Sequence, residues 1–308
     1  MRRSTQEITY LLLTLTAVIW GGNYIANKVL MRELAPLTAA VVRFASAAAL
    51  MLVVLGLRRQ LRLLTRAELK GVAGLGVIFF LHNLFYYFGL ERTTAINASL
   101  LMATSPVITC LLAERLAKER VSLLQLAGTL LSLGGVFLVV TGEAGVAVRR
   151  VALNAGDLLM LFSAATWSLY SLQGKGLMAT LTPLETTVYS WVVGTGLLLP
   201  VAFLFRSRAG HWLPVSAPGW WSLAYVVVLS AVVAFSWWYR AIDAVGAARS
   251  SAFINLVPLS VLILAALLLG ETVSYSQVGG AGCILFGVYL ASLQETLAAK
   301  TGRVRFSG

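Results

Sequence analysis

Residues 95–135 read AINASLLMATSPVITCLLAERLAKERVSLLQLAGTLLSLGG, and residues 247–287 read AARSSAFINLVPLSVLILAALLLGETVSYSQVGGAGCILFG. One constant shift, from Ala95 to Ala247, aligns the two stretches on polar residues, prolines and glycines as well as on apolar residues. The further identical pairs are Ser99 and Ser251, Pro106 and Pro258, Glu119 and Glu271, Ser122 and Ser274, Gln125 and Gln277, Gly128 and Gly280, and Gly135 and Gly287. Such matches in one order predict two copies of a single structural unit.

The earlier part of the chain repeats as well, with a shift that is five residues shorter. It pairs Trp20 with Trp167, Lys28 with Lys175, Met31 with Met178, and Pro36 with Pro183. A short insertion in the loop at 58–70 would account for the difference between the two shifts. The sequence therefore predicts a first repeat at 1–141, a connecting loop at 142–154, a second repeat at 155–294 and a basic tail at 295–308.

Hydropathy places this repeat in a membrane. The chain is 59% hydrophobic and 12% charged, whereas soluble domains carry about 25% charged residues. It divides into ten apolar runs of the length that crosses a bilayer, at 8–30, 37–57, 70–90, 94–115, 122–141, 155–177, 184–206, 218–240, 247–269 and 275–294. Because five runs per copy is an odd number, the second copy enters the membrane upside down. We predict an all-α integral membrane fold of ten transmembrane helices in two inverted five-helix repeats, the architecture of secondary transporters.

The charge distribution predicts the orientation. The net charge is +12, but the basic residues lie between apolar runs rather than on a polar domain, which argues against nucleic-acid binding. With the N-terminus in the cytoplasm, 16 of the 24 Lys and Arg residues lie inside, seven lie outside and Arg43 lies within a run. The positive-inside rule therefore favours two cytoplasmic termini.

Several repeated residues have structural explanations. Ser122 with Gln125, and Ser274 with Gln277, fit helix-capping boxes. The glycine pairs seven residues apart, at 128 and 135 and at 280 and 287, each lie on one helix face and favour close packing, in one arrangement between the fifth and tenth runs. Pro106 and Pro258 fall near mid-membrane, where each is expected to bend its helix and to serve either shape or gating.

The motifs also resemble a known family. They are W-G-G-N-Y-x-x-x-K from Trp20 to Lys28, Arg43-Phe44, S-P-V-x(11)-E ending at Glu119, and P-L-S-x(10)-E ending at Glu271. The chain resembles the drug/metabolite transporter superfamily, in its EamA group of ten-helix proteins, over residues 8–294. The resemblance implies a bacterial inner-membrane carrier, often an exporter of amino acids, other metabolites or toxic compounds. Ser190 stands at the second-half counterpart of Arg43, which argues against a strictly symmetric site.

Enzymatic and cofactor motifs are missing from the sequence. There is no G-x-x-x-x-G-K-[ST], H-E-x-x-H, G-x-S-x-G or C-x-x-C motif, so we predict no nucleotide hydrolysis, no metal site and no cofactor. Transport by this chain would therefore be secondary, driven by a gradient.

Polar and aromatic residues inside the runs predict a mid-membrane pocket, because polar groups in hydrocarbon tend to face a bundle interior. In the first and third runs they recur at helical spacing on one face. The predicted substrate-binding residues are Trp20, Asn23, Tyr24, His82, Asn83, Tyr86, Met102, Trp167, Tyr170, Trp238 and Asn255. Aromatic faces there would favour flat or cationic groups. The alternative is that the aromatics form an interfacial belt and the amides bond neighbouring helices.

Charged residues near the run ends have two interpretations. Lys28, Arg43 and Lys175 would either extend to the headgroups or attract a carboxylate or phosphate at the mouths of the pathway. No carboxylate falls at mid-membrane, which argues against a sodium site or a deep carboxylate relay. Of the two histidines in the sequence, His82 is the one that lies inside an apolar run. It is therefore the candidate proton carrier if transport is coupled to protons.

These observations predict a secondary exporter of small amphipathic metabolites, such as amino acids or aromatic compounds, working by alternating access. One alternative is an organic-anion or phosphate-ester antiporter, which the three basic residues would suit. Another is a membrane-embedded enzyme using His82. The expected partners are a small-molecule substrate and the lipid bilayer, with a monomer favoured.

Overall fold

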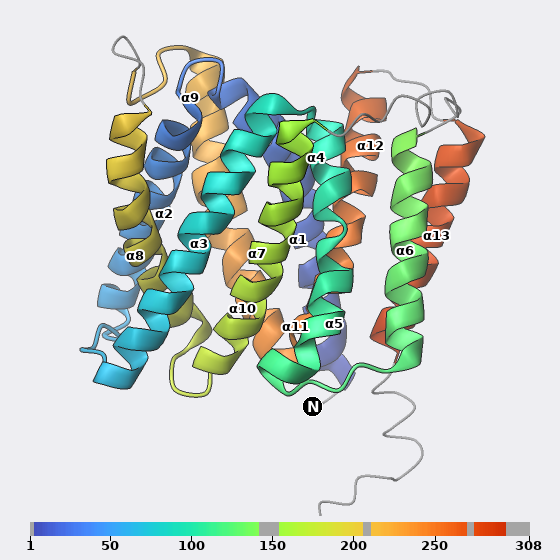
Figure 1. Ribbon diagram of the computed structural model, residues 1–308, viewed down its shortest axis with the longest axis horizontal. Helices are drawn as coiled ribbons and strands as arrows, with labels where there is room; N and C mark the ends of the chain where they lie inside the picture. The colour runs from blue at the N-terminus through green and yellow to red at the C-terminus, as the bar shows by residue number, and fades with distance from the viewer. Residues whose placement is uncertain (1–2, 142–153, 206–210, 270–273, 294–308) are drawn as a thin grey trace, which may run out of the picture.

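The computed structural model of the chain describes residues 3–141, 154–205, 211–269 and 274–293. These residues form an all-helical bundle without strands (Figure 1). The ten predicted runs appear as α1 (Arg3–Leu30), α2 (Pro36–Leu57), α3 (Arg66–Arg92), α4 (Ala95–Met102) with α5 (Ser105–Ala117), α6 (Leu123–Thr141), α7 (Ala155–Leu177), α8 (Pro183–Leu204), α9 (Ala217–Ala224) with the π-helix η2 (Tyr225–Val233) and α10 (Ala234–Val245), α11 (Ala247–Ala252) with the 3-10 turn η3 (Phe253–Asn255) and α12 (Leu256–Leu269), and α13 (Tyr275–Ser292).

Eight helical segments in the described part of the chain are long and apolar enough to cross a membrane. The two runs outside that set are α7, which carries buried serines, and α13, which carries buried glycines at a helix contact. The fold is thus the predicted all-α integral membrane fold. We call the end at which α1 begins the amino-terminal face, and the end at which α1 finishes the opposite face; they are the lower and upper ends in Figure 1.

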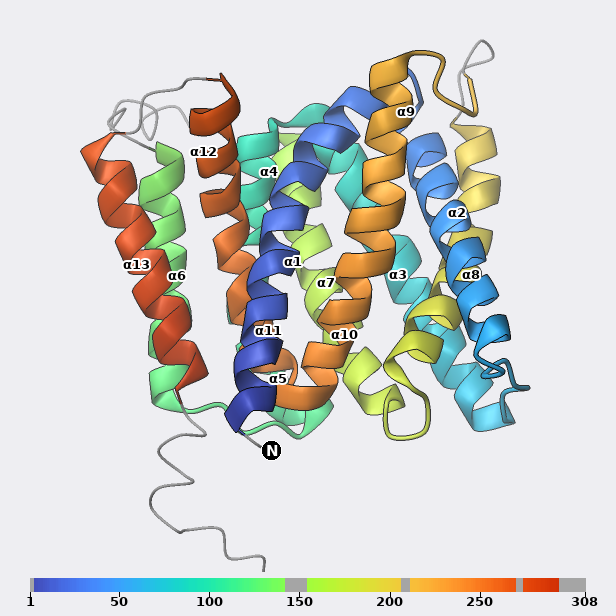
Figure 2. The same ribbon diagram turned by 180° about the vertical axis from the view of Figure 1, so that it is seen from behind.

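Helix contacts interlock the two predicted halves. Helix α1 lies along α10 (Figure 2) and also packs on α12, while α7 packs in the corresponding way on α3 and α5. Exchanging the halves also maps the α2 contact with η2 onto the α8 contact with α3. Two pairs, α2 with α8 and α6 with α13, join equivalent helices of the two halves. The first helix of each half therefore packs mainly on the other half, and the halves do not form separate domains.

Helix starts follow the capping residues. Ser274 and Gln277 form a complete capping box, as predicted, and Ser122 Oγ accepts a hydrogen bond of 3.1 Å from the Gln125 amide. Glu119 has a different role, because its carboxylate accepts from the Ala247 and Ala248 amides at 2.7 and 2.9 Å. It thereby stabilises the orphan amides at the start of α11. Its counterpart Glu271 lies outside the described residues.

The predicted bends are interruptions of the helix. The fourth run breaks between α4 and α5, with Pro106 in the first turn of α5. The ninth run breaks at η3, with Pro258 in the first turn of α12. Both breaks lie directly before the proline, since that residue cannot donate the backbone hydrogen bond that would continue the helix.

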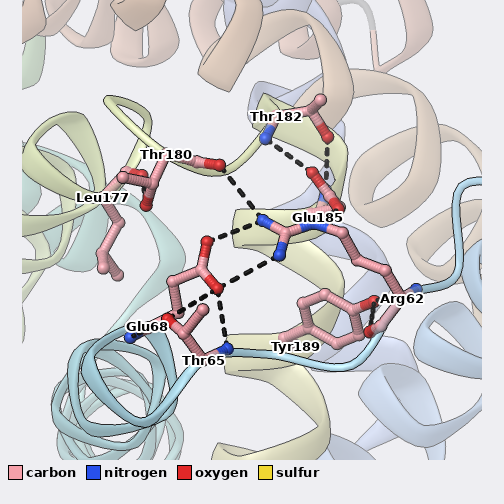
Figure 3. Close-up of polar contacts among 8 residues, drawn as sticks. All are labelled: Arg62, Thr65, Glu68, Leu177, Thr180, Thr182, Glu185 and Tyr189. Atoms are coloured by element: carbon pink, nitrogen blue, oxygen red, sulfur yellow. Dashed lines mark hydrogen bonds and ion pairs between the residues drawn. The ribbon is translucent and has the colours of Figure 1, made fainter.

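One loop contact closes the amino-terminal face. Arg62 forms a bidentate ion pair with Glu68, at 2.7 and 3.1 Å, and also donates to Glu185 Oε1 at 3.0 Å and to the Thr180 carbonyl at 3.1 Å (Figure 3). The hydrogen bonds to Glu68 raise the pKa of Arg62, so the guanidinium stays charged. This cluster ties the loop after α2 to the loop after α7.

The corresponding loop contact lies on the opposite face. The Glu33 carboxylate, after α1, accepts from the Val215 amide at 2.8 Å, from the Ser216 amide at 3.2 Å and from the Ser216 hydroxyl. These three bonds lower the pKa of Glu33, and the bond from the Ser216 hydroxyl has the largest effect. The two faces are thus each held by one charged residue between equivalent pairs of loops.

The glycine face between α6 and α13 confirms the predicted pairing of the fifth and tenth runs. A Cβ added at Gly287 would lie 2.5 Å from the Gly128 carbonyl oxygen, and one at Gly135 would lie 2.6 Å from the Gly280 carbonyl oxygen. The two helices therefore approach so closely that backbone meets backbone (Figure 1).

We expect Gly287→Ala to lower the melting temperature of the purified protein in detergent, because forced overpacking costs about 1–3 kcal/mol. Gly282→Ala on the same helix is the matched control, since a Cβ there meets nothing within 4 Å. Equal melting temperatures for the two variants would contradict the close contact.

Candidate functional site

A cavity of about 70 Å³ lies inside the bundle. It is lined from both halves: by α1, α2, α3 and α4 of the first, and by α7, α10, η3 and α12 of the second. The lining residues are Trp20, Asn23, Tyr24, Arg43, Phe44, His82, Asn83, Tyr86, Met102, Trp167, Phe235, Ile254 and Val257. Met102 and Ile254 lie at the two helix breaks. The cavity therefore lies beside both helix interruptions.

Most of the predicted substrate-binding residues line this cavity. They are Trp20, Asn23, Tyr24, His82, Asn83, Tyr86, Met102 and Trp167. Three predicted residues do not line it. Trp238 is buried behind two tryptophans, Tyr170 is buried with its hydroxyl 3.0 Å from Ser190 Oγ, and the Asn255 amide donates to Ser132 Oγ. Trp238 and Asn255 therefore support the lining rather than contribute to it.

An aromatic layer closes the cavity toward the amino-terminal face. The Trp20 ring lies 5.4 Å from Trp167, 5.4 Å from Phe235 and 5.2 Å from Trp238, measured between ring centroids. Trp191 extends the layer, 4.9 Å from Phe235. Edge-to-face and tilted contacts of this kind are favourable for aromatic rings. Three rings of the layer, those of Trp20, Trp167 and Phe235, also line the cavity.

A chain of hydrogen bonds runs along one wall and joins four helical segments. Arg43 Nη2 donates to Ser230 Oγ at 2.9 Å, and Ser230 Oγ donates to Asn23 Oδ1 at 2.9 Å. Asn23 Nδ2 in turn donates to the Tyr86 hydroxyl at 3.2 Å. Ser230 lies in the π-helix, whose irregular backbone also leaves its carbonyl to accept from Trp20 Nε1 at 3.2 Å. The network fixes Asn23 and orients Arg43.

His82 lies on another wall, against the second half. Its Nδ1 is 3.1 Å from the Ser163 carbonyl and 3.0 Å from Ser163 Oγ. A carbonyl can only accept, so this geometry suits a proton on Nδ1. Asn83 donates to the Phe79 carbonyl at 2.9 Å on its own helix. Neither residue contacts a carboxylate, and the described residues hold no group of three or more His, Cys, Asp or Glu that could bind a metal.

The position of Arg43 contradicts the prediction that its side chain extends to the lipid headgroups. It is 4% exposed and lines the cavity, so it does not extend to a membrane surface. Its guanidinium lies 4.6 Å over the Phe44 ring. The apolar lining residues Phe44, Phe235, Ile254 and Val257 were missing from the predicted set, because an apolar residue in a membrane helix gives no signal of facing a cavity.

Lys28 and Lys175 do not line the cavity, and both are bonded to backbone carbonyls. Lys28 Nζ donates to the Thr93 carbonyl at 2.7 Å and to the Leu90 carbonyl, where α3 ends. Lys175 Nζ donates to the Ile242 and Asp243 carbonyls at 3.0 and 2.9 Å, where α10 ends. Each lysine therefore caps the carboxyl end of a helix in its own half, which also suits the helix dipole.

We expect Lys28→Met to destabilise the folded protein without changing ligand affinity, because hydrogen bonds to a charged group contribute roughly 1.5–3 kcal/mol. Lys70→Met, at an exposed lysine on α3, is the matched control. Thermal unfolding in detergent measures the first effect, and ligand titration measures the second. A Lys28→Met protein as stable as the control would contradict the capping role.

Comparisons with known proteins agree with this architecture. The model of the EamA-like transporter family matches residues 7–141 and again residues 154–293. An uncharacterized transporter of Bacillus subtilis, YyaM, is 29% identical over 288 residues, 92% of this chain and 93% of its own. A probable terminal-alkyne amino-acid exporter of Streptantibioticus cattleyicolor is 31% identical, over 87% of this chain and 88% of its own.

A solved crystal structure has the same fold, with a TM-score of 0.75 and 18% identity over 94% of this chain and 97% of that one. The family model matches once in each half, as the sequence repeat does, and the two matches together cover nearly the whole described bundle. The chain belongs to the EamA-like transporter family of the drug/metabolite transporter superfamily.

Proposed function

We propose that this transporter is a secondary exporter of small amphipathic metabolites, working by alternating access around the central cavity. The observation that carries the proposal is the cavity itself, since its lining combines aromatic rings with a few fixed polar groups from both halves. Sites of this composition, near the middle of two interlocked repeats, suit small molecules with an apolar body and a polar group. The similarity to a probable amino-acid exporter supports the same substrate range.

The inverted-repeat arrangement supplies the mechanism. We propose residues 1–141 and 155–294 as the two repeats, because exchanging them maps the main helix contacts and both lysine caps onto one another. The cavity lies nearer the opposite face, with the aromatic layer between it and the amino-terminal face. With the Arg62 cluster and the Glu33 contact both formed, this state would be closed at both faces and would open at either face when the contact there is released. The Arg62 cluster would close one face and the Glu33 contact would close the other, each released in turn.

The proposed location is the bacterial inner membrane, with both termini in the cytoplasm, on the basis of the distribution of Lys and Arg. Export would then proceed from the amino-terminal face to the opposite face. A cysteine placed at Ser4, labelled in intact cells by a membrane-impermeant reagent, would contradict this orientation.

The function is tested by reconstitution. We expect proteoliposomes to accumulate members of a panel of radiolabelled amino acids and aromatic compounds, whereas vesicles without protein do not. Running the assay with and without a pH gradient, for the parent and for His82→Gln, also tests whether transport is coupled to protons through His82. Product formation without movement across the membrane would instead favour the membrane-enzyme alternative.

We expect Trp20→Ala and Trp167→Ala to weaken substrate affinity severalfold while the protein still folds, because a lost ring contact costs about 0.5–1.5 kcal/mol beyond the buried area. Trp221→Ala is the matched control, since that side chain is 77% exposed at the surface of α9. Unchanged affinity in both cavity variants would exclude the cavity as the binding site.

The loop contacts give a separate prediction. Arg62→Gln removes the bidentate pair with Glu68, so we expect it to favour the state open at the amino-terminal face. The apparent KM at that face should fall severalfold and rise at the other, with the reverse pattern for Glu33→Gln. Arg66→Gln, at an exposed neighbour, is the control. Acid should mimic Glu33→Gln only below the lowered pKa of Glu33, where its carboxylate becomes protonated. Equal shifts at both faces would contradict the gating role.

A further inference from the structure

Arg43 is a buried cation without a counter-ion. The hydrogen-bond partner of its guanidinium is the hydroxyl of Ser230, which carries no charge. Ion pairs among the described residues involve Arg62 and Arg92, and no described carboxylate lies within ion-pair distance of Arg43. A charge inside a membrane protein is costly unless it is paired. The folded protein therefore retains an unpaired positive charge in the wall of its cavity.

The remaining lining has the same polarity. No Asp or Glu is among the cavity-lining residues. Two buried donors of lining residues, Arg43 Nε and Trp167 Nε1, have no hydrogen-bond partner in the described part of the protein. Buried donors are normally satisfied, and exceptions require an explanation. A cavity with a cation and spare donors suits a ligand that brings negatively charged acceptor atoms.

The surroundings of Arg43 hold its guanidinium in one position. The chain through Ser230, Asn23 and Tyr86 fixes one of its amino groups, and the Phe44 ring lies under the guanidinium. The corresponding position of the second half is Ser190, which is buried, bonds to Tyr170 Oη and does not line the cavity. A site with this charge therefore exists once, on the first half.

We propose that the cavity binds the carboxylate of an amphipathic organic acid, with Arg43 as its charged partner and the rings of Trp20, Trp167 and Phe235 against its apolar part. The inference rests on the proposed transport function and names the substrate class. A carboxylate matches the planar fork of a guanidinium. A phosphate ester, which carries up to two negative charges, fits less well, because Lys28 and Lys175 are engaged at helix ends and leave a single cation. Aromatic walls by themselves would favour flat or cationic ligands, but the positive charge of Arg43 repels cations.

Three indole compounds of similar size separate charge from shape. They are indole-3-propionate, an anion; tryptophan, a zwitterion; and tryptamine, a cation. Binding to the purified full-length transporter in detergent is measured by equilibrium dialysis of the tritiated compounds. We expect the parent to bind indole-3-propionate at least about tenfold more tightly than tryptamine, a difference equivalent to about 1.4 kcal/mol.

Arg43→Gln should abolish this preference, by weakening indole-3-propionate about tenfold without weakening tryptamine. Arg43→Lys should restore part of it, since the charge remains and the fork is lost. Arg92→Gln, at a half-exposed arginine on the surface, is the matched control and should leave the preference unchanged. Trp167→Phe keeps an aromatic ring but removes the unpaired donor, so it should weaken the anion more than the cation. Size-exclusion profiles verify folding of each variant.

Equal affinity for the anion and the cation, a preference that survives Arg43→Gln, or no binding of any of the three by the folded parent would overturn the carboxylate site. Parallel uptake measurements in proteoliposomes keep the two claims apart. Transport of the compounds regardless of charge would leave the transport function standing and the carboxylate site refuted. Arg43-dependent binding without any uptake would support the carboxylate site and refute the transport function.

Discussion

Inside a bilayer a backbone amide or carbonyl without a hydrogen-bond partner costs several kcal/mol, and no water is present to supply one. In this protein that constraint decides what the charged and polar side chains do wherever a helix ends or breaks. Lys28 and Lys175 cap the carboxyl ends of α3 and α10, and Glu119 caps the amino end of α11. Charges that would be expensive in hydrocarbon are thereby used to satisfy the backbone.

The cavity exists because the same constraint is relaxed in the middle of the bundle. Two helices break before Pro106 and Pro258, and the π-helix around Ser230 leaves a carbonyl and a hydroxyl pointing at neighbouring helices. Irregular backbone at membrane depth is tolerated only where it is buried in protein or lines a cavity. Trp20, Asn23 and Arg43 supply the partners at Ser230. The irregular segments and the polar wall therefore depend on one another, and both halves are required to form them.

The sequence predicted the helical fold and most of the cavity lining for physical reasons. Repeated prolines and glycines mark backbone geometry, so they located the helix breaks and the contact of α6 with α13. Polar residues at helical spacing identified the faces of α1 and α3 that line the cavity. The predictions failed where a side chain's role depends on its partner. Asn255 turns to Ser132, and Lys28 finds carbonyls of α3, because of distances that no sequence pattern records.

The central claim is that this cavity is a water-accessible transport site that opens to the opposite face. The most direct measurement is the thiol reactivity of Met102→Cys, in a protein whose native Cys110 and Cys283 are replaced by alanine, in vesicles of known orientation. A hydrophilic, impermeant reagent should modify this cysteine faster from the opposite face than from the amino-terminal face. It should not modify a cysteine at Leu111, which is 65% exposed on the outer surface of α5. Failure of the reagent to reach position 102 from either face of the folded protein would contradict the account.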